Sequence, residues 1–195
     1  MTIFDELRAA YRASQDTYRN YAGDCLRVAH QLADEFRAYI GAPETYTDPD
    51  DETRRPYVRL LAFQLQDDTP VAVQPQSQAD ILARDPDGFW RFALSLTLER
   101  DPDSFPKQSI AFFLRLKVRG AEWHVQLLDH EFLDHRFEPP GDAEKRDLFG
   151  HMVDMVTRVL EAKPWEGIEK LPIGFELERP KPPTGDDPDA LLEAP

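Results

Sequence analysis

Two long segments in the middle of the chain constrain the fold most, because apolar and polar residues alternate along both of them. Within residues 89–100 the apolar positions are Trp90, Phe92, Leu94, Leu96 and Leu98. Residues 109–127 continue the alternation with Ile110, Phe112, Leu114, Leu116, Val118, Trp123, Val125 and Leu127. A period of two is typical of a strand with one buried face. Residues 89–128 therefore predict three strands that share one apolar face.

The sequence Arg119-Gly120-Ala121-Glu122 joins the second and third of these strands. Glycine at the first central position is what a two-residue type II′ hairpin turn requires. If Arg119 lies opposite Glu122, the apolar face contains the pairs Val118–Trp123, Leu116–Val125 and Leu114–Leu127. A shift of one residue would mix the two faces, so the pattern predicts the register as well as the hairpin.

The same register gathers basic residues on the opposite face of the hairpin. These residues are Arg115, Lys117, Arg119 and His124, with Arg91 on the neighbouring strand. The chain has a formal net charge of −14, so a local basic surface suggests an anionic ligand such as a phosphate, an acidic peptide or nucleic acid. Alternatively, these residues only keep an exposed strand soluble, since Glu99 and Glu122 share the face. Nucleic acid is the least expected ligand, because only Phe113 could stack on a base.

Apolar residues recur at three- and four-residue steps through residues 3–40, which predicts a long amphipathic helix. The stripe consists of Phe4, Leu7, Tyr11, Tyr18, Tyr21, Cys25, Val28, Leu32, Phe36 and Tyr39. A continuous helix of this length would measure about 54 Å, whereas a domain of this size is about 40 Å across. Either the helix breaks between Asn20 and Asp24, near Gly23, or one end extends beyond the domain. The stripe fits a helix that faces the core and also a helix that pairs with another chain.

The remaining patterns complete an α+β fold. Residues 57–66 predict a first strand, residues 142–163 a buried helix with Asp142 as its N-cap, and residues 173–177 a short edge strand. Residues 44–56 resemble a solvated linker, and the spacing of Ser77 and Asp80 predicts a short capped helix. We therefore predict one domain over residues 1–179, in which the long N-terminal helix and the buried C-terminal helix pack on one face of a four-stranded, or five-stranded, antiparallel β-meander. Residues 180–195, acidic and rich in proline, are predicted to be disordered.

Histidines and carboxylates gather in the C-terminal third of the chain. His130 and His135 lie within the segment DHEFLDH, and His151 and Asp154 follow three residues apart in the last predicted helix. These four residues are candidates for catalysis, and the three histidines are candidates for metal binding. Against this interpretation, the chain has no HExxH or similarly spaced motif, and a polar loop after a sheet has the same composition. No metal or other cofactor is predicted.

Composition limits the class and location of the protein. The single cysteine, Cys25, excludes an intrachain disulfide and suits a reducing compartment. The longest apolar run, residues 110–114, is far too short to cross a bilayer. We therefore expect a cytoplasmic protein that does not contact membranes.

These observations favour a non-enzymatic binding or accessory protein that acts through protein–protein contacts, as a homo-oligomer or with another protein. The surfaces available for such contacts are the helix stripe, the acidic linkers and the basic face of the sheet. The alternative is a ligand-binding cup, or a metal-dependent enzyme that uses His130, His135 and His151. Acidic mimicry of nucleic acid is the least favoured interpretation, because many carboxylates lie in loops and in the tail.

Overall fold

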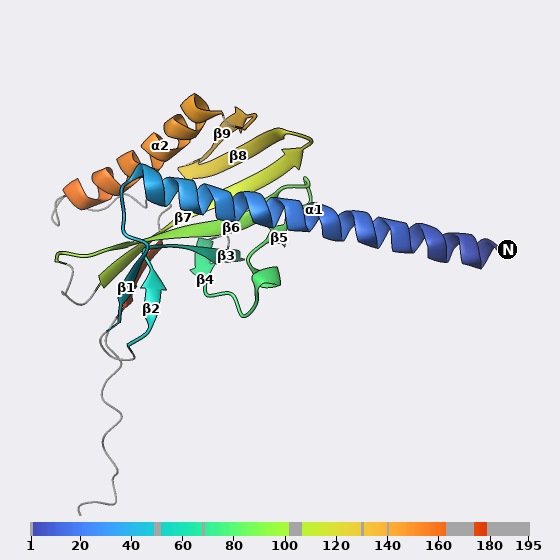
Figure 1. Ribbon diagram of the computed structural model, residues 1–195, viewed down its shortest axis with the longest axis horizontal. Helices are drawn as coiled ribbons and strands as arrows, with labels where there is room; N and C mark the ends of the chain where they lie inside the picture. Colours follow the sequence, from blue (N-terminus) through green and yellow to red (C-terminus); the bar gives the residue numbers. More distant parts are fainter. Residues whose placement is uncertain are drawn as a thin grey trace, which may run out of the picture.

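The elements of the computed structural model form two layers, a sheet and two helices that cover one of its faces (Figure 1). The structure describes residues 2–48, 52–67, 69–101, 107–129, 131–139, 141–162 and 174–178. The helices are α1 (Ile3–Tyr39), the 3₁₀ helix η1 (Gln78–Asp80) and α2 (Asp142–Glu161). The strands are β1 (Thr45–Thr47), β2 (Arg54–Pro56), β3 (Val58–Gln66), β4 (Thr69–Val73), β5 (Ala83–Arg84), β6 (Trp90–Leu98), β7 (Lys107–Arg119), β8 (Glu122–Asp129), β9 (Glu131–Phe137) and β10 (Gly174–Glu178). The predicted α+β class is confirmed.

The β7–β8 hairpin has the predicted register, with Arg119 opposite Glu122. β6 pairs with the other edge of β7, as expected for a meander. The apolar pairs are Val118–Trp123, Leu116–Val125 and Leu114–Leu127, as expected. Gly120 has a φ of +61°, and Ala121 is not among the residues with positive φ, which is the backbone of a type II′ turn. This turn decides which side chains face the helices.

The sheet is larger than the predicted four or five strands. Its order is β4-β3-β6-β7-β8-β9, with β5 paired to β6 and β10 paired to the first part of β7. The pattern of β9 resembles a polar loop because Asp134 and Arg136 face outward, although His135 and Phe137 alternate with them as buried residues. The strands β4 and β5 are too short to show a clear period. Residues 44–56 are also not a simple linker, since they contain the β1–β2 hairpin.

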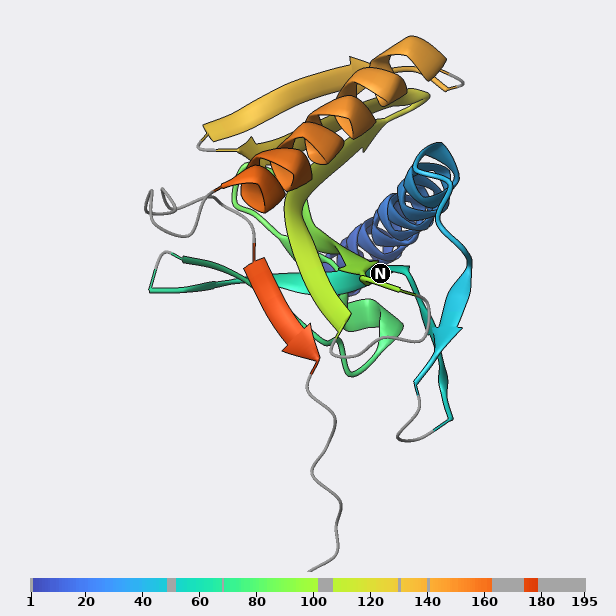
Figure 2. The same ribbon diagram turned by 90° about the vertical axis from the view of Figure 1, so that its left-hand side faces the viewer.

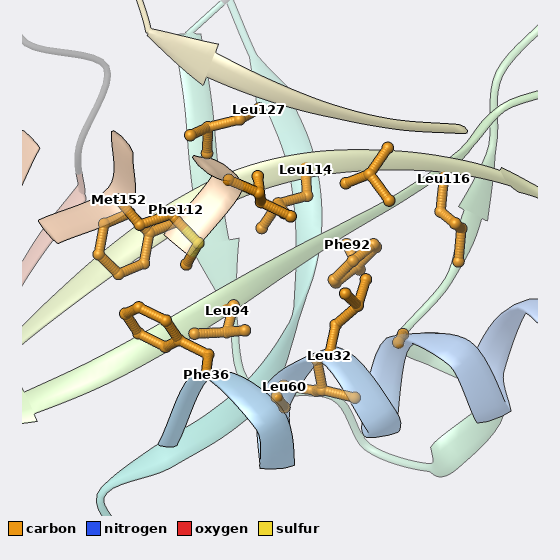
Figure 3. Packing of buried hydrophobic residues seen from close by; sticks show 14 of the residues in the cluster. Leu32, Phe36, Leu60, Phe92, Leu94, Phe112, Leu114, Leu116, Leu127 and Met152 are labelled. Carbon is orange, nitrogen blue, oxygen red and sulfur yellow. The ribbon is translucent and has the colours of Figure 1, made fainter. Parts of the chain in front are cut away.

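The main core lies between the apolar face of the sheet and the two helices (Figure 3). α1 contributes only its C-terminal half, with Cys25, Val28, Ala29, Leu32, Ala33 and Phe36 buried. Phe36 packs against Phe112 of β7 and Phe149 of α2, with ring centroids 5.7 and 5.5 Å apart. Phe92 and Phe112 are fully buried, so these aromatic residues fill the core between the sheet and the helices.

The opposite face of the sheet is partly buried as well. A second cluster consists of Leu61, Phe63, Ala93, Ala111 and Phe113. Farther along the same face, the Lys107 side chain is completely buried and forms an ion pair with Glu99. Tyr57 donates a hydrogen bond of 2.6 Å to Glu99 and packs against Tyr46 of β1. This polar group connects the β1–β2 hairpin to the sheet, and only part of the face that the sequence predicts as polar is solvated.

α1 is continuous through Gly23, so of the two alternatives that helix length leaves open, the break near Asn20–Asp24 is wrong and the extended end is correct. Thr2 and Asp5 form a capping box at its start, and Gly41, with a φ of +66°, ends it in the left-handed conformation. A helix of this length measures about 55 Å.

The other helix boundaries differ slightly from expectation. α2 has Gly141 rather than Asp142 as its N-cap residue, because Asp142 already has helical geometry. The capping box of Ser77 and Asp80 is present, but it opens a 3₁₀ turn. Within the described ranges, neither α-helix has a stretch that is both long and apolar enough to cross a membrane. The predicted tail, residues 180–195, lies outside the described residues.

Candidate functional site

The N-terminal half of α1 extends beyond the sheet, as Figure 1 shows. Every residue from Ile3 to Asn20 is exposed, and we call residues 3–20 the projecting helix. The exposed fractions of its large apolar residues are 78% for Ile3, 64% for Phe4, 63% for Leu7 and 66% for Tyr11. Large apolar side chains grouped on one exposed surface are typical of interaction sites.

The uncovered stripe continues the face of α1 that packs on the sheet. Phe4, Leu7 and Tyr11 lie on the same side of the helix as Cys25 and Leu32, which are buried. Contact with the sheet begins at Tyr18 and Tyr21, whose rings lie 5.4 and 6.4 Å from that of Trp90. The stripe therefore has the same chemical character in both halves of α1, but this chain covers only one half.

The projecting helix is electrically balanced in a strongly acidic protein. Its acidic residues are Asp5, Glu6 and Asp16, and its basic residues are Arg8, Arg12 and Arg19. Their charges cancel, whereas the whole chain has a formal net charge of −14. Asp5 and Glu6 lie at one end and Arg19 at the other. The projecting helix can therefore approach another acidic protein without the electrostatic repulsion expected at the rest of this protein's surface.

The register brings Arg91 and Arg115 together on the opposite face, but two carboxylates accompany them. Arg91 Nε lies 2.7 Å from Asp85 Oδ1. Arg115 Nη1 lies 3.4 Å from Asp85 and 3.1 Å from Asp87, and its Nε donates a hydrogen bond of 2.9 Å to Gln126. Asp85 and Asp87 belong to the turn before β6. Because these carboxylates balance both guanidinium groups, Arg91 and Arg115 have little charge left to attract an anion.

The other predicted basic residues, Lys117, Arg119 and His124, line a shallow hollow of about 190 Å³ with Phe89, Glu122 and Arg136. Lys117 donates a hydrogen bond of 2.8 Å to the Asp87 carbonyl oxygen, and His124 Nε2 lies 3.1 Å from Asp134. The hydrogen bond from His124, together with one from Gln126, lowers the pKa of Asp134. An anion site here stays a prediction, and Lys117, Arg119 and Arg136 are the residues that would form it.

The structure brings together two of the three histidines that are candidates for metal binding. His135 on β9 and His151 on α2 have ring centroids 5.3 Å apart. Figure 2 shows α2 lying alongside β8 and β9. Asp147, one turn before His151, places Oδ2 3.5 Å from His135 Nδ1. His130 lies outside the described residues. Asp154 is exposed and does not belong to the group formed by His135, Asp147 and His151.

The rings of His135 and His151 each have a buried nitrogen without a hydrogen-bond partner among the described residues. Burial lowers the pKa of His135, the nearby His151 lowers it further, and Asp147 opposes the shift. His135 Nε2 and His151 Nδ1 are buried, and neither has a hydrogen-bond partner in the described part of the chain. A buried ring nitrogen without a partner costs free energy, so the pair of orphan nitrogens calls for a physical explanation.

Sequence reasoning did not select Asp147, although a signal was present. Asp147 and His151 are four residues apart in a predicted helix, which places both side chains on one face. The contact of this face with β9 is not evident from the sequence, because the local pattern of β9 resembles that of a loop.

No protein-family model matches the chain, and neither curated proteins nor solved structures include a significant match to it.

Proposed function

We propose that the protein is a non-enzymatic binding or accessory protein that acts through protein–protein contacts, with the projecting helix as its docking element. The exposed stripe of Ile3, Phe4, Leu7 and Tyr11 carries this proposal. A lone chain leaves these side chains in water. It also leaves about four turns of helix without tertiary support, and helices of this length are marginal on their own. A partner that covers the stripe removes both penalties.

The partner that fits this surface best is a second copy of the chain, with the two projecting helices antiparallel. A twofold interface places the stripe of one copy on the identical stripe of the other. With Leu7 near the twofold axis, the antiparallel direction sets Asp5 and Glu6 of one helix near Arg8 of the other, whereas a parallel direction would set like charges side by side. The zero net charge of the segment allows two acidic molecules to meet there.

The apolar surface that such a dimer would bury supports a weak association. Four large apolar residues of each projecting helix are more than 60% exposed, and fully burying one side chain of this size stabilises by about 2 kcal/mol. The eight side chains of two copies together contribute on the order of 10 kcal/mol, which is comparable to the cost of association, about 4–15 kcal/mol. We expect a dimer that dissociates on dilution rather than an obligate one.

The dimer can be tested by sedimentation velocity of the full chain over a range of concentrations. We expect the wild-type protein to sediment as a dimer at high concentration, and Leu7→Glu to be monomeric because two charges would be buried at the centre of the interface. The matched control is Ala9→Glu, which adds the same charge about 180° around the helix. It should dimerise like the wild type.

The result that overturns the proposal is a wild-type protein that stays monomeric at every concentration. Equal dissociation of the Leu7→Glu and Ala9→Glu variants would also contradict it, because charge alone, and not the stripe, would then control association. Circular dichroism of each variant checks that the domain remains folded.

We also propose a cytoplasmic location. Cys25 is a buried free thiol, and a chain with one unpaired cysteine suits a reducing compartment. Fractionation of the producing cells tests this expectation, and recovery of the protein outside the cytoplasm would contradict it.

A further inference from the structure

We propose that His135, Asp147 and His151 bind one divalent transition-metal ion, for which zinc is the best match. One donor atom from each residue lies within 4.8 Å of the other two. Donor atoms around tetrahedral zinc are about 3.3 Å apart, given zinc–nitrogen distances near 2.0–2.1 Å. Side-chain rotations within two adjacent elements can close this difference.

The donor set selects the class of ion. Two imidazoles and one carboxylate suit zinc and similar transition metals, whereas calcium and magnesium prefer sites made of oxygen alone. Three protein ligands leave the fourth tetrahedral position for water or another small ligand. The exposed side chain of Asp147, 66% accessible, lies on the solvent side of the group, so an ion can enter without opening the core.

Independent support comes from the buried nitrogens. His135 is only 6% exposed, yet its Nε2 has no hydrogen-bond partner among the described residues, and the same holds for His151 Nδ1. Each ring thus offers a nitrogen lone pair, or a proton, that the described protein groups do not satisfy. Burial also lowers the pKa of His135, which favours neutral imidazole, the form that binds metal.

The site would join two elements that otherwise meet through side-chain packing. His135 belongs to β9, the last strand of the main sheet order, whereas Asp147 and His151 belong to α2. An ion held by both elements stabilises the folded chain, since an unfolded chain cannot present the three ligands together. This role is separate from the projecting helix and does not depend on dimer formation.

The test uses full-length protein without a histidine tag, freed of metal by a chelator. Titration with zinc should show one ion per chain by calorimetry and should raise the melting temperature. Cobalt should give the visible absorption of a four-coordinate complex. Asp147→Asn and His151→Gln should each weaken zinc binding by at least about tenfold, and both changed side chains are at least partly accessible, so the fold should survive.

The matched control is Asp154→Asn, which removes an exposed carboxylate from the same helix three residues beyond His151. It should bind zinc like the wild type. Failure of the wild-type protein to bind zinc, or equal binding by the wild type, Asp147→Asn and His151→Gln, would overturn the proposal. The dimer test is unaffected by either result, because its variants change the projecting helix and leave His135, Asp147 and His151 in place.

Discussion

Cys25 is the first buried residue of α1, and its thiol is fully buried. Burial raises its pKa to about 11. The folded state therefore holds the proton more tightly than the unfolded state, whose thiol ionises near pH 9. The contribution of Cys25 to the free energy of unfolding is therefore complete below pH 9 and is lost as the pH rises from 9 to about 11.

We predict that Cys25 resists modification in the folded protein. At pH 8 a thiol reagent should react with it only through opening of the core, because both the thiolate and the access that the reaction needs are lacking. The rate should approach that of a free cysteine after addition of denaturant, which serves as the control. Immediate reaction in the absence of denaturant would show that α1 does not cover this position.

The candidate metal site shows how residue-level prediction depends on neighbouring structure. His135 and His151 are identifiable in the sequence because histidine near carboxylates suggests a metal ligand. The sequence does not show that His135 faces α2, since this requires β9 to be a strand with His135 and Phe137 inward. Asp147 becomes relevant only through that contact, which joins residues distant in the chain.

At the scale of elements, glycine has opposite effects in α1 and in the β7–β8 turn. Gly23 is an exposed helical residue, and a Cβ atom there would meet nothing within 4 Å. Gly120 also has open space, but its φ of +61° disfavours other residues.

We predict that Gly23→Ala stabilises the protein by about 0.5–1 kcal/mol. Gly120→Ala should destabilise it by about 1 kcal/mol, because the turn must hold a strained backbone. Each variant acts as the control for the other, since both add a single methyl group in open space. Chemical denaturation measures the two changes, and changes of equal sign would contradict the argument.

The elements that the sequence predicts well are those with a long period or a demanding turn. The β7–β8 register follows from Gly120 and three apolar pairs, and α1 follows from a stripe of ten residues. β4 and β5 are short, and β9 places charged residues on its outer side, so their local patterns resemble loops. Only pairing with a neighbouring strand makes them part of the sheet.

At the scale of the whole molecule, sequence length predicts that a continuous first helix cannot fit within the domain. It does not predict which outcome holds, because the cost of Gly23 in a helix, about 1 kcal/mol, is small enough for the flanking turns to tolerate. The position of Trp90 decides where the sheet begins to support α1, since Tyr18 and Tyr21 pack on the Trp90 ring.

We predict that amide hydrogen exchange in the projecting helix depends on protein concentration. At low concentration residues 3–16 should exchange rapidly, and at high concentration the dimer should slow them. Residues 25–36 should be protected at both concentrations, because they pack on the sheet. Mass spectrometry of peptides from the two regions measures the difference. Strong, concentration-independent protection of residues 3–16 would contradict the prediction.

In the proposed dimer, the continuity of α1 would make its order depend on protein concentration. One half of the helix is packed within the chain and the other half would be covered by a second copy, so the order of its first turns would report how many copies are present. Association at one end also fixes the direction in which each body is held, because the same helix continues without a hinge into the core. The spacing between two bodies is thereby set by a count of helical residues rather than by a flexible connection.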